Sequence, residues 1–379
     1  MSTIFHLDLD AFFVSVERLL DLSLEGKPVI VGGNPQGRGV VAACSYEARQ
    51  NGLHSGMPIR AAFKLCPHGV YLHGHHKEYV RYSHSVKNIL DQYAPLIEQA
   101  SIDECYMDFT GCEKIYGSLF SFASFLQKEI AVKTGLPCSI GIGSNKTLAK
   151  IGSDCMKPKG ITYIIPGMAK EFLAPMPVEV IPGVGKVLLR DLNSKGIYKI
   201  CDITKLPADY FVAAYGKYGV DLWRKANGEG TEYLTVSHGQ KSISKETTFD
   251  EDVTSKEKLK YVLFELTGRV CHTLRENSWQ AATINIKLRY SDFQTLTRAK
   301  TIKPTDDDRV VFDTAWDIMQ KAHTRRIAVR LIGIGVSKLN SFAEQEVLFE
   351  DETAKRKKLF RAVNQLRGKY DYKIIRMGV

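Results

Sequence analysis

The chain has 379 residues, a length that predicts two or three domains. Of these residues 44% are hydrophobic and 25% charged, a composition typical of a globular protein and not of a disordered chain. It carries 52 Lys and Arg against 42 Asp and Glu, and this net charge of +10 permits a nucleic-acid partner without requiring one. The eight cysteines form no CxxC pair, the acidic N-terminus is no signal peptide, and no stretch approaches the ~20 apolar residues of a membrane span. We therefore expect a soluble, cytoplasmic protein with reduced thiols and no membrane partner.

The first 167 residues alternate short apolar strands with longer helical patterns, which predicts an α+β or α/β arrangement. Strands are expected at residues 3–9, 29–31, 40–43, 99–109 and 138–142. Helices are expected at residues 13–20, 77–93, 116–134 and 146–154.

Strand signals are missing between residues 168 and 232, where short helical patterns are broken by Pro-Gly and Gly-Lys turns. The polar segment 230–239 then suits an interdomain linker. From residue 241 to 340 there are 18 Lys and Arg against 13 Asp and Glu, so half of the net charge lies in about a quarter of the chain. In this region strands are expected at residues 242–249, 281–290, 296–303 and 328–339, and helices near 255–277 and 308–322.

Two acidic pairs stand in or beside apolar strands. Asp8 and Asp10 alternate with leucines, so both project from one face of a strand. Asp103 and Glu104 reach one site together only at a hairpin turn, which the polar segment 98–101 can supply. Three carboxylates that converge from two strands form an all-oxygen site suited to Mg²⁺, and two such ions about 4 Å apart serve in-line phosphoryl transfer. The alternative is that the first pair caps the following helix and the second lies in a solvated turn.

Cationic groups that could bind a triphosphate lie in the same region. Tyr46 and Arg49 are three residues apart and would share a helix face. Lys157 precedes Pro158, which ends a helix and leaves the lysine at its exposed end. Each of these residues taken alone is more often an ordinary solvated side chain. The run Gly-Ile-Gly-Ser-Asn-Lys-Thr at 141–147 has Asn145 where a P-loop needs glycine, which excludes a P-loop ATPase.

The segment Ile-Pro-Gly-Val-Gly-Lys at 181–186 is followed by a helical run. Such a turn places backbone N–H groups at the start of a helix, where they can bind a phosphate. The pattern is typical of a helix-hairpin-helix, which grips the DNA backbone without reading bases, and residues 216–219 form a weaker second copy. An ordinary glycine turn between helices is the alternative.

Four motifs in this order resemble those of the Y-family translesion DNA polymerases, in the DinB-like branch: residues 8–13, 45–49, 101–104 and 181–186. The resemblance covers residues 3–340 and implies an α+β multidomain, right-hand polymerase. Its implied parts are a ferredoxin-like palm (1–10 and 75–166), small fingers (11–74), a helical thumb with the helix-hairpin-helix (167–232), a linker (233–240), an α/β little finger (241–340) and a charged tail (341–379).

The resemblance implies that Asp8, Asp103 and Glu104 are catalytic and hold two Mg²⁺ ions, with the Leu9 backbone carbonyl as a further ligand. Phe13 matches the steric gate, an aromatic ring that leaves no room for a ribose 2′-hydroxyl. The nucleotide-binding residues implied are Phe12, Phe13, Tyr46, Arg49 and Lys157. Many relatives carry threonine where this chain has Ala43, so triphosphate binding is expected to rest more on Tyr46 and Arg49.

The implied reaction transfers a dNMP from a dNTP to the primer 3′-hydroxyl on a template, with release of pyrophosphate. One metal ion lowers the pKa of the hydroxyl and the second holds the triphosphate and the leaving pyrophosphate. Small fingers and no remaining length for a proofreading nuclease imply low fidelity and an open site, which lesion bypass requires.

Two alternatives explain less of the sequence. A nucleotidyl cyclase built on the same palm leaves the helix-hairpin-helix and the basic C-terminal domain without a role. A non-catalytic DNA-binding scaffold would lack a carboxylate, and all three are present.

The expected partners are primer-template DNA, a dNTP and a sliding clamp, bound by a monomeric chain. DNA contacts should be to phosphates and sensitive to salt. The expected DNA-binding residues are Gly183, Gly185, Lys186, Lys241, Ser242, Lys245, Arg289, Arg298 and Arg330, with Lys300, Arg325 and Arg326 as further candidates. Gln345, Leu348 and Phe349 resemble the QxxLF peptide by which bacterial polymerases dock on the clamp.

Three other features carry no predicted chemistry. His73, His75 and His76 have no matching Cys or carboxylate pattern, so no zinc site is expected there. Cys105 and Cys112 flank a strand and are expected to pack. A tail helix is expected to place Leu359, Val363 and Leu366 on one apolar stripe.

Overall fold

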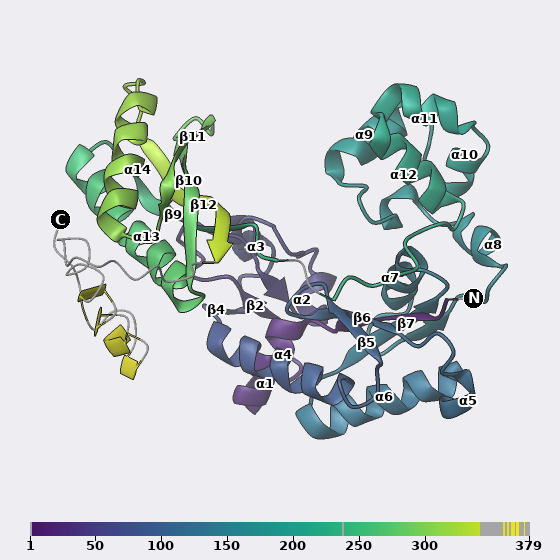
Figure 1. Cartoon of the computed structure of the whole chain (residues 1–379). Coiled ribbons are helices and arrows are strands. Elements are labelled where there is room, and N and C mark those ends of the chain that lie inside the picture. The colour runs from purple at the N-terminus through teal and green to yellow at the C-terminus, as the bar shows by residue number, and fades with distance from the viewer. Residues whose placement is uncertain are drawn as a thin grey trace. The chain divides into compact units, whose positions relative to one another are not determined.

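The computed structural model describes residues 2–236 and 239–341 and, in the tail, residues 359–360, 362–363, 365–367, 369–370 and 375. The chain divides into two compact units, Met1–His238 and Gly239–Val379 (Figure 1). Among the residues described, no helix is long and apolar enough to cross a membrane.

The first unit is built on a five-stranded sheet in the order β5-β6-β1-β7-β8, in which only β7 and β8 run parallel. Every residue of the central strand β1 is buried, because helices cover both faces of the sheet. Phe5 and Leu7 pack against α4 and α6, while His6 faces α7, where its Nδ1 lies 2.7 Å from the Ser153 hydroxyl. The elements are β1 (Ile4–Leu9), α4 (His76–Leu90), β5 (Leu96–Gln99), β6 (Glu104–Asp108), α5 (Glu113–Tyr116), α6 (Leu119–Thr134), β7 (Cys138–Gly143), α7 (Lys146–Cys155) and β8 (Ile161–Tyr163).

The prediction of one strand over residues 99–109 is wrong, because this segment is a hairpin. β5 and β6 pair in antiparallel register with Gln99 opposite Cys105, and residues 100–103 form the turn. The Ser101 hydroxyl accepts a 3.0 Å hydrogen bond from the N–H of Glu104, a side-chain turn closure typical of serine. The turn therefore lies two residues later than the predicted one.

A second, three-stranded sheet in the order β3-β2-β4 lies between α1 and α4 in the sequence. The predicted strand at 40–43 is wrong in extent, since the structure has a two-residue strand and one isolated bridge between Val40 and Pro58. Strands of two or three residues are too short to show the alternation of apolar and polar side chains by which a strand is predicted. Strand β4 and helix α3 have no counterpart among the predicted elements. The elements are α1 (Phe12–Leu20), η1 (Leu22–Leu24), β2 (Val29–Val31), β3 (Ala43–Cys44), α2 (Tyr46–Gln50), α3 (Ile59–Leu65) and β4 (Val70–Leu72).

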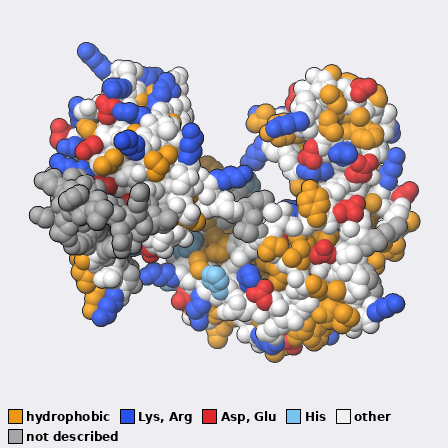
Figure 2. All heavy atoms as spheres, in the orientation of Figure 1, with side chains coloured by type: hydrophobic (Ala, Val, Ile, Leu, Met, Phe, Trp, Pro, Cys, Tyr) orange, Lys and Arg blue, Asp and Glu red, His pale blue; other side chains and the backbone are white. Residues whose placement is uncertain are grey.

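Short helices follow, packed around a core that contains Leu192, Ile200 and Phe211 and that also includes Leu148 and Ile151 of α7. On the face shown in Figure 2, hydrophobic side chains remain exposed over these helices. Val187 and Tyr198 are two exposed hydrophobic residues of this region. The elements are α8 (Ala169–Leu173), η2 (Val178–Val180), α9 (Lys186–Ser194), α10 (Ile200–Thr204), α11 (Ala208–Tyr215) and α12 (Lys217–Ala226).

The first half of the predicted linker is bound to the five-stranded sheet. The Lys146 N–H donates a 2.9 Å hydrogen bond to the Thr231 carbonyl, and the Thr235 N–H donates a 2.8 Å hydrogen bond to Glu98. Leu234 is buried against Ile4 and its neighbours. Residues 231–235 of the predicted linker are therefore held against the first unit.

The second unit is an antiparallel sheet in the order β11-β10-β12-β9, with α13 and α14 packed on one face. In β10 the residues Ile284, Ile286 and Leu288 are buried against the helices, and Lys287 and Arg289 alternate with them on the open face. This is the predicted order of strands and helices. The elements are β9 (Ser242–Val253), α13 (Lys256–Glu276), β10 (Trp279–Tyr290), β11 (Thr295–Thr305), α14 (Asp308–Ala322) and β12 (Val329–Ser341).

In the tail, the buried stripe differs from the predicted one. Leu359 and Leu366 are exposed, whereas Phe360, Val363 and Arg367 are buried. The Arg275 guanidinium of α13 lies 4.9 Å from the centre of the Phe360 ring. The spacing 360, 363 and 367 also follows a helical face, so periodicity alone did not distinguish the two stripes.

Candidate active site

The predicted carboxylates meet where β1 and β6 lie side by side. Asp8 and Glu104 are directly opposite each other in the antiparallel register of these strands. The next residue of β1, Leu9, donates its N–H to the Asp103 carbonyl at 3.0 Å, which holds the hairpin turn beside the end of β1. Side-chain alternation along β1 and the hairpin at 100–103 thus place Asp8, Asp103 and Glu104 at one end of the sheet.

Each of these carboxylates has a partner in the first unit. Lys157 Nζ lies 2.7 Å from Asp8, and Lys150 Nζ lies 2.7 Å from Glu104. Asp103 accepts a hydrogen bond from the Ser101 hydroxyl. The buried Asp8 and the half-buried Glu104 are thus compensated mainly by two lysines, one from α7 and one from the segment after it.

Burial and charge affect Asp8 and Glu104 in opposite ways. Burial raises the pKa of Asp8 to about 7, although the ammonium of Lys157 acts against this shift. The His6 ring, 3.6 Å away, and the Lys150 ammonium lower the pKa of Glu104 to about 2. Burial also lowers the pKa of His6, so its ring is neutral at pH 7. Glu104 is therefore ionised throughout the physiological range, whereas Asp8 titrates within it.

The donor set suits a divalent cation. Asp8, Asp103, Glu104 and the Leu9 carbonyl offer only oxygen atoms, which Mg²⁺ prefers, and the desolvated Asp8 favours a cation at short distance. In the described part of the chain no three Asp, Glu, His or Cys side chains converge as metal ligands. The carboxylates are instead directed to Lys157, Lys150 and Ser101, as described above.

A cavity of about 180 Å³ lies between Asp8, Leu9 and Asp103 on one side and α1 and α2 on the other, and Glu104 is not among the residues that line it. All five predicted nucleotide-binding residues line it, as do Asp8, Leu9 and Asp103. Ala43, where threonine was expected, lines it too, and so does Ser55, a residue that the sequence patterns did not indicate. The full lining is Asp8, Leu9, Ala11, Phe12, Phe13, Ala42, Ala43, Tyr46, Arg49, Ser55, Asp103 and Lys157.

Tyr46 and Arg49 stand together because Ser45 caps α2. The Ser45 hydroxyl accepts a 3.2 Å hydrogen bond from the Ala48 N–H, which starts the helix and puts the two residues on one face. The Arg49 guanidinium lies 4.7 Å from the centre of the Tyr46 ring. Burial raises the pKa of Tyr46 to about 12, so its hydroxyl remains a hydrogen-bond donor.

Asp10 has different surroundings from Asp8, although alternation along the strand places both side chains on one face. Its side chain is buried and accepts hydrogen bonds from the Ser139 hydroxyl at 2.9 Å and from the Lys159 N–H at 2.8 Å. Asp10 is therefore a structural acceptor, and it is not among the residues that line the cavity.

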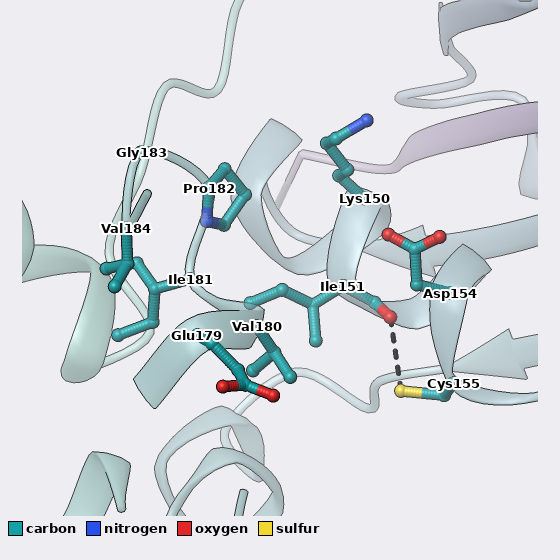
Figure 3. A pocket seen from close by; sticks show the side chains of 10 residues that line it. All are labelled: Lys150, Ile151, Asp154, Cys155, Glu179, Val180, Ile181, Pro182, Gly183 and Val184. Carbon is teal, nitrogen blue, oxygen red and sulfur yellow. Dashed lines mark hydrogen bonds between the residues drawn. The ribbon is translucent and has the colours of Figure 1, made fainter. Parts of the chain in front are cut away.

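Lys150 and His6 were missed by the sequence interpretation. A signal for Lys150 existed, since Lys146, Lys150 and Asp154 are four residues apart and share one face of α7. Figure 3 shows Lys150 and Asp154 projecting from this helix, with the turn that contains Pro182 across from them. A second cavity, of about 330 Å³, lies between α7 and this turn.

The turn predicted to belong to a helix-hairpin-helix leads into a helix, α9, whose N-terminus has no side-chain cap. Gly183 has φ +108°, and Gly185 precedes α9 without any side-chain cap on the helix. Gly183, Gly185 and Lys186 are all exposed. The N–H groups of the first turn of α9 therefore face solvent beside a lysine, which suits a phosphate.

The predicted DNA-binding residues of the second unit do not share one face. Arg289 and Ser242 align with the open face of the sheet, whereas Lys245 and Arg298 are opposite the buried Ile334 and Ile286. These two cations extend from the edge strands on the helix side. Lys241 is exposed, Arg330 lies over the Phe293 ring, and Lys300 and Arg325 form ion pairs with Asp317 and Asp292.

On the face shown in Figure 2, Asp and Glu side chains stand among the Lys and Arg side chains of this unit. Arg326 is exposed. The predicted clamp-binding residues Gln345, Leu348 and Phe349 lie outside the described residues.

Family models match both units. The model of the impB/mucB/samB family matches residues 7–154, and the model of the impB/mucB/samB family C-terminal domain matches residues 240–348. The DNA polymerase IV of Dehalococcoides mccartyi strain CBDB1 is 38% identical over 377 residues, which cover 99% of this chain and 96% of the relative. The DNA polymerase IV of Methanoculleus marisnigri is 38% identical over 92% of this chain and 97% of its own length.

Solved structures are similar over most of the chain. The Y-family DNA polymerase chimera Dbh-Dpo4(243-245)-Dbh matches with a TM-score of 0.79 and 28% identity, over 89% of this chain and 99% of the chimera. The insertion ternary complex of Dbh DNA polymerase matches with a TM-score of 0.62 and 28% identity, over 88% of this chain and 98% of that chain.

Proposed function

The chain belongs to the impB/mucB/samB family of Y-family DNA polymerases, and we propose that Asp8, Asp103 and Glu104 are the carboxylates with which it synthesises DNA. It is a DNA-directed DNA polymerase of low fidelity that performs translesion synthesis, and its α+β multidomain fold is the expected one. The observation that carries the assignment of the site is the position of Asp8 opposite Glu104, with Asp103 in the adjoining turn, beside a cavity that also contains Tyr46 and Arg49.

We assign the parts of the polymerase to the structure as follows. The five-stranded sheet with its helices would be the palm (1–10 and 75–166), and the three-stranded sheet with α1 to α3 would be the fingers (11–74). Helices α8 to α12 would be the thumb (167–232), and the second unit would contain the little finger (241–340). The family implies a divalent metal ion, which we take to be Mg²⁺, two ions per site.

The residues that line the cavity, together with Glu104 opposite Asp8, then have distinct tasks. Asp8, Asp103, Glu104 and the Leu9 carbonyl would hold the metal ions. When bound, such ions lower the pKa of the primer 3′-hydroxyl and neutralise the phosphates of the dNTP. The Tyr46 hydroxyl and the guanidinium of Arg49 would bind the triphosphate, as donors that stay protonated at pH 7.

Two further side chains complete the proposed nucleotide site. The Lys157 ammonium, which balances the charge of Asp8 in this structure, would bind the triphosphate. The Phe13 ring would lie under the sugar and exclude a 2′-hydroxyl, with Phe12 beside it. The nucleotidyl cyclase and the non-catalytic scaffold both lose support, since relatives with polymerase names match the chain from end to end.

Primer extension on an undamaged and on an abasic template tests the assignment. The wild-type chain is compared with Asp103→Ala/Glu104→Ala and with Asp108→Ala, which removes a carboxylate from the other end of β6. We expect extension by the wild type and by Asp108→Ala, and a loss of at least about 1,000-fold in the double variant, with DNA affinity retained. Extension by the double variant at the wild-type rate would refute the assignment.

We further propose that the chain works as a monomer in the cytoplasm and binds a sliding clamp. The clamp proposal rests on the QxxLF motif at Gln345, Leu348 and Phe349, which directly follows the second sheet in the sequence. Primer-template DNA would contact the exposed turn before α9 and the cations of the second unit.

A further inference from the structure

A buried carboxylate that takes no part in the proposed reaction lies directly behind the steric gate. Glu17 of α1 is only 3% exposed. Its carboxylate accepts a 2.9 Å hydrogen bond from the backbone N–H of His75 and a short hydrogen bond from the Tyr79 hydroxyl. The Nδ1 of His75 lies 3.0 Å from the second carboxylate oxygen. Burying a carboxylate is costly, and these donors compensate for the lost hydration.

The ring of Tyr79 connects this carboxylate to Phe13. The two rings are stacked, with centroids 4.3 Å apart and an interplanar angle of 12°. Phe13 and Glu17 are four residues apart on α1 and therefore lie on one face of the helix, about one turn apart. Tyr79 of α4 spans this turn, so that its ring covers Phe13 while its hydroxyl reaches Glu17.

The hydroxyl of Tyr79 is enclosed by the chain that precedes α4. Gly74 has φ +83°, and a Cβ added there would lie 2.5 Å from the Tyr79 hydroxyl oxygen and 2.8 Å from Val31 Cγ1. The Tyr79 side chain is itself only 3% exposed. Glycine is thus required at this position for two reasons, its backbone conformation and the lack of space.

We propose that Glu17 is a positioning residue for the discrimination between deoxyribonucleotides and ribonucleotides. By fixing the Tyr79 hydroxyl, Glu17 fixes the ring on which Phe13 stacks, and through it the distance between Phe13 and the sugar. A selective site needs its contact groups held to within about 0.5 Å by packing and by supporting hydrogen bonds. This inference rests on the proposed function, in which Phe13 is the steric gate.

Single-nucleotide insertion opposite a template guanine tests the inference. The measured quantity is the ratio of kcat/KM for dCTP to kcat/KM for CTP. Glu17→Gln replaces the charged acceptor by a neutral amide of the same size, and Tyr79→Phe removes only the hydroxyl. The matched controls are Glu78→Gln and Tyr82→Phe on α4, whose side chains take no part in the Glu17 contacts.

We expect the ratio to fall about three- to tenfold in Glu17→Gln and in Tyr79→Phe, a change that corresponds to the strength of one aromatic pair. Insertion of dCTP should stay within about twofold of the wild type, and both controls should keep the wild-type ratio. An equal loss of dCTP and CTP insertion in Glu17→Gln would mean that Glu17 only supports the fold, and would overturn the inference.

Phe13→Ala separates this inference from the proposed function. We expect Phe13→Ala to lower the ratio about 100-fold, and Glu17→Gln to have no further effect in the Phe13→Ala background. A fall in Phe13→Ala with unchanged ratios in Glu17→Gln and Tyr79→Phe would overturn the role of Glu17 alone. An unchanged ratio in Phe13→Ala would overturn the steric gate and the role of Glu17 together.

Discussion

The Asp10 carboxylate accepts a 2.8 Å hydrogen bond from the backbone N–H of Lys159, which is 149 residues further along the chain. This contact joins the end of β1 to the segment that follows α7. The same segment carries Lys157, whose ammonium lies 2.7 Å from Asp8. The position of a proposed triphosphate ligand therefore depends on a carboxylate that is not among those lining the cavity.

Asp10→Ala should destabilise the first unit and displace Lys157. The substitution leaves the Ser139 hydroxyl and the Lys159 N–H without their acceptor. We expect the free energy of unfolding to fall by about 2–4 kcal/mol, since each buried unpaired donor costs about 1–3 kcal/mol. DNA synthesis should fall about tenfold. Urea denaturation measures the stability and single-nucleotide insertion measures the synthesis. Asp10→Asn keeps one acceptor oxygen and should lose less stability than Asp10→Ala. Equal urea midpoints for Asp10→Ala and the wild type would contradict the prediction.

Binding of Mg²⁺ should weaken as the pH falls below 7. Burial raises the pKa of Asp8 to about 7, so that more of these carboxyls carry a proton at pH 6 than at pH 8 in the metal-free protein. A protonated carboxyl does not bind the cation, whereas Glu104, with its pKa lowered to about 2, stays ionised. We expect the Mg²⁺ concentration for half-maximal insertion to be about tenfold higher at pH 6 than at pH 8. DNA affinity is measured at both pH values as a control, and equal Mg²⁺ requirements would contradict the prediction.

Lys186 should contribute one phosphate contact to DNA binding. Its side chain is exposed at the uncapped start of α9. In Lys186→Ala the slope of log affinity against log salt concentration should become shallower by about 0.9, whatever the DNA sequence. Lys133→Ala removes a lysine of α6 that is ion-paired with Glu129, and should leave the slope unchanged. If Lys186→Ala kept the wild-type slope, Lys186 would not contact a DNA phosphate and the turn would not belong to the DNA interface.

Leu348→Ala/Phe349→Ala should abolish the stimulation of DNA synthesis by a sliding clamp. An extended peptide that anchors Leu and Phe in an apolar pocket loses most of its affinity when both side chains are removed. Basal primer extension without clamp should stay at the wild-type level. An equal loss of basal and clamp-stimulated extension would show that these residues serve the polymerase itself.

The buried ion pair of the second unit should stabilise it strongly. Arg275 and Asp308 are joined at 3.2 Å, and their side chains are 8% and 5% exposed. Asp308→Ala leaves the buried guanidinium without its carboxylate, so we expect a loss of about 3–5 kcal/mol in urea denaturation. The matched control is Asp313→Ala, which breaks an exposed pair with Arg309 and should change stability by less than about 1 kcal/mol. A loss as small as that of the control would contradict the prediction.

The candidate site was predicted in part from local pattern. Alternation in β1 correctly indicated that Asp8 lies on the face opposite Leu7, and cross-strand register explains why Glu104 meets it. The same alternation also paired Asp8 with Asp10, and the structure agrees, because the Asp10 carboxylate accepts a hydrogen bond from Ser139 of β7, the residue opposite Asp8 in the register. Alternation did not show that Asp10 would accept hydrogen bonds from Ser139 and Lys159 and stay outside the cavity lining.

The sequence by itself determined the order of strands and helices in the second unit, the family motifs and the residue types of the site, because side-chain periodicity and turn chemistry are local properties. Only the tertiary structure decided that Lys150 pairs with Glu104, that Asp10 holds Lys159, and that Tyr79 joins Phe13 to Glu17. These contacts connect residues 46, 149 and 62 positions apart. Such partners are selected by the packing of whole elements, since only the buried sheet and its helices bring them within hydrogen-bond distance.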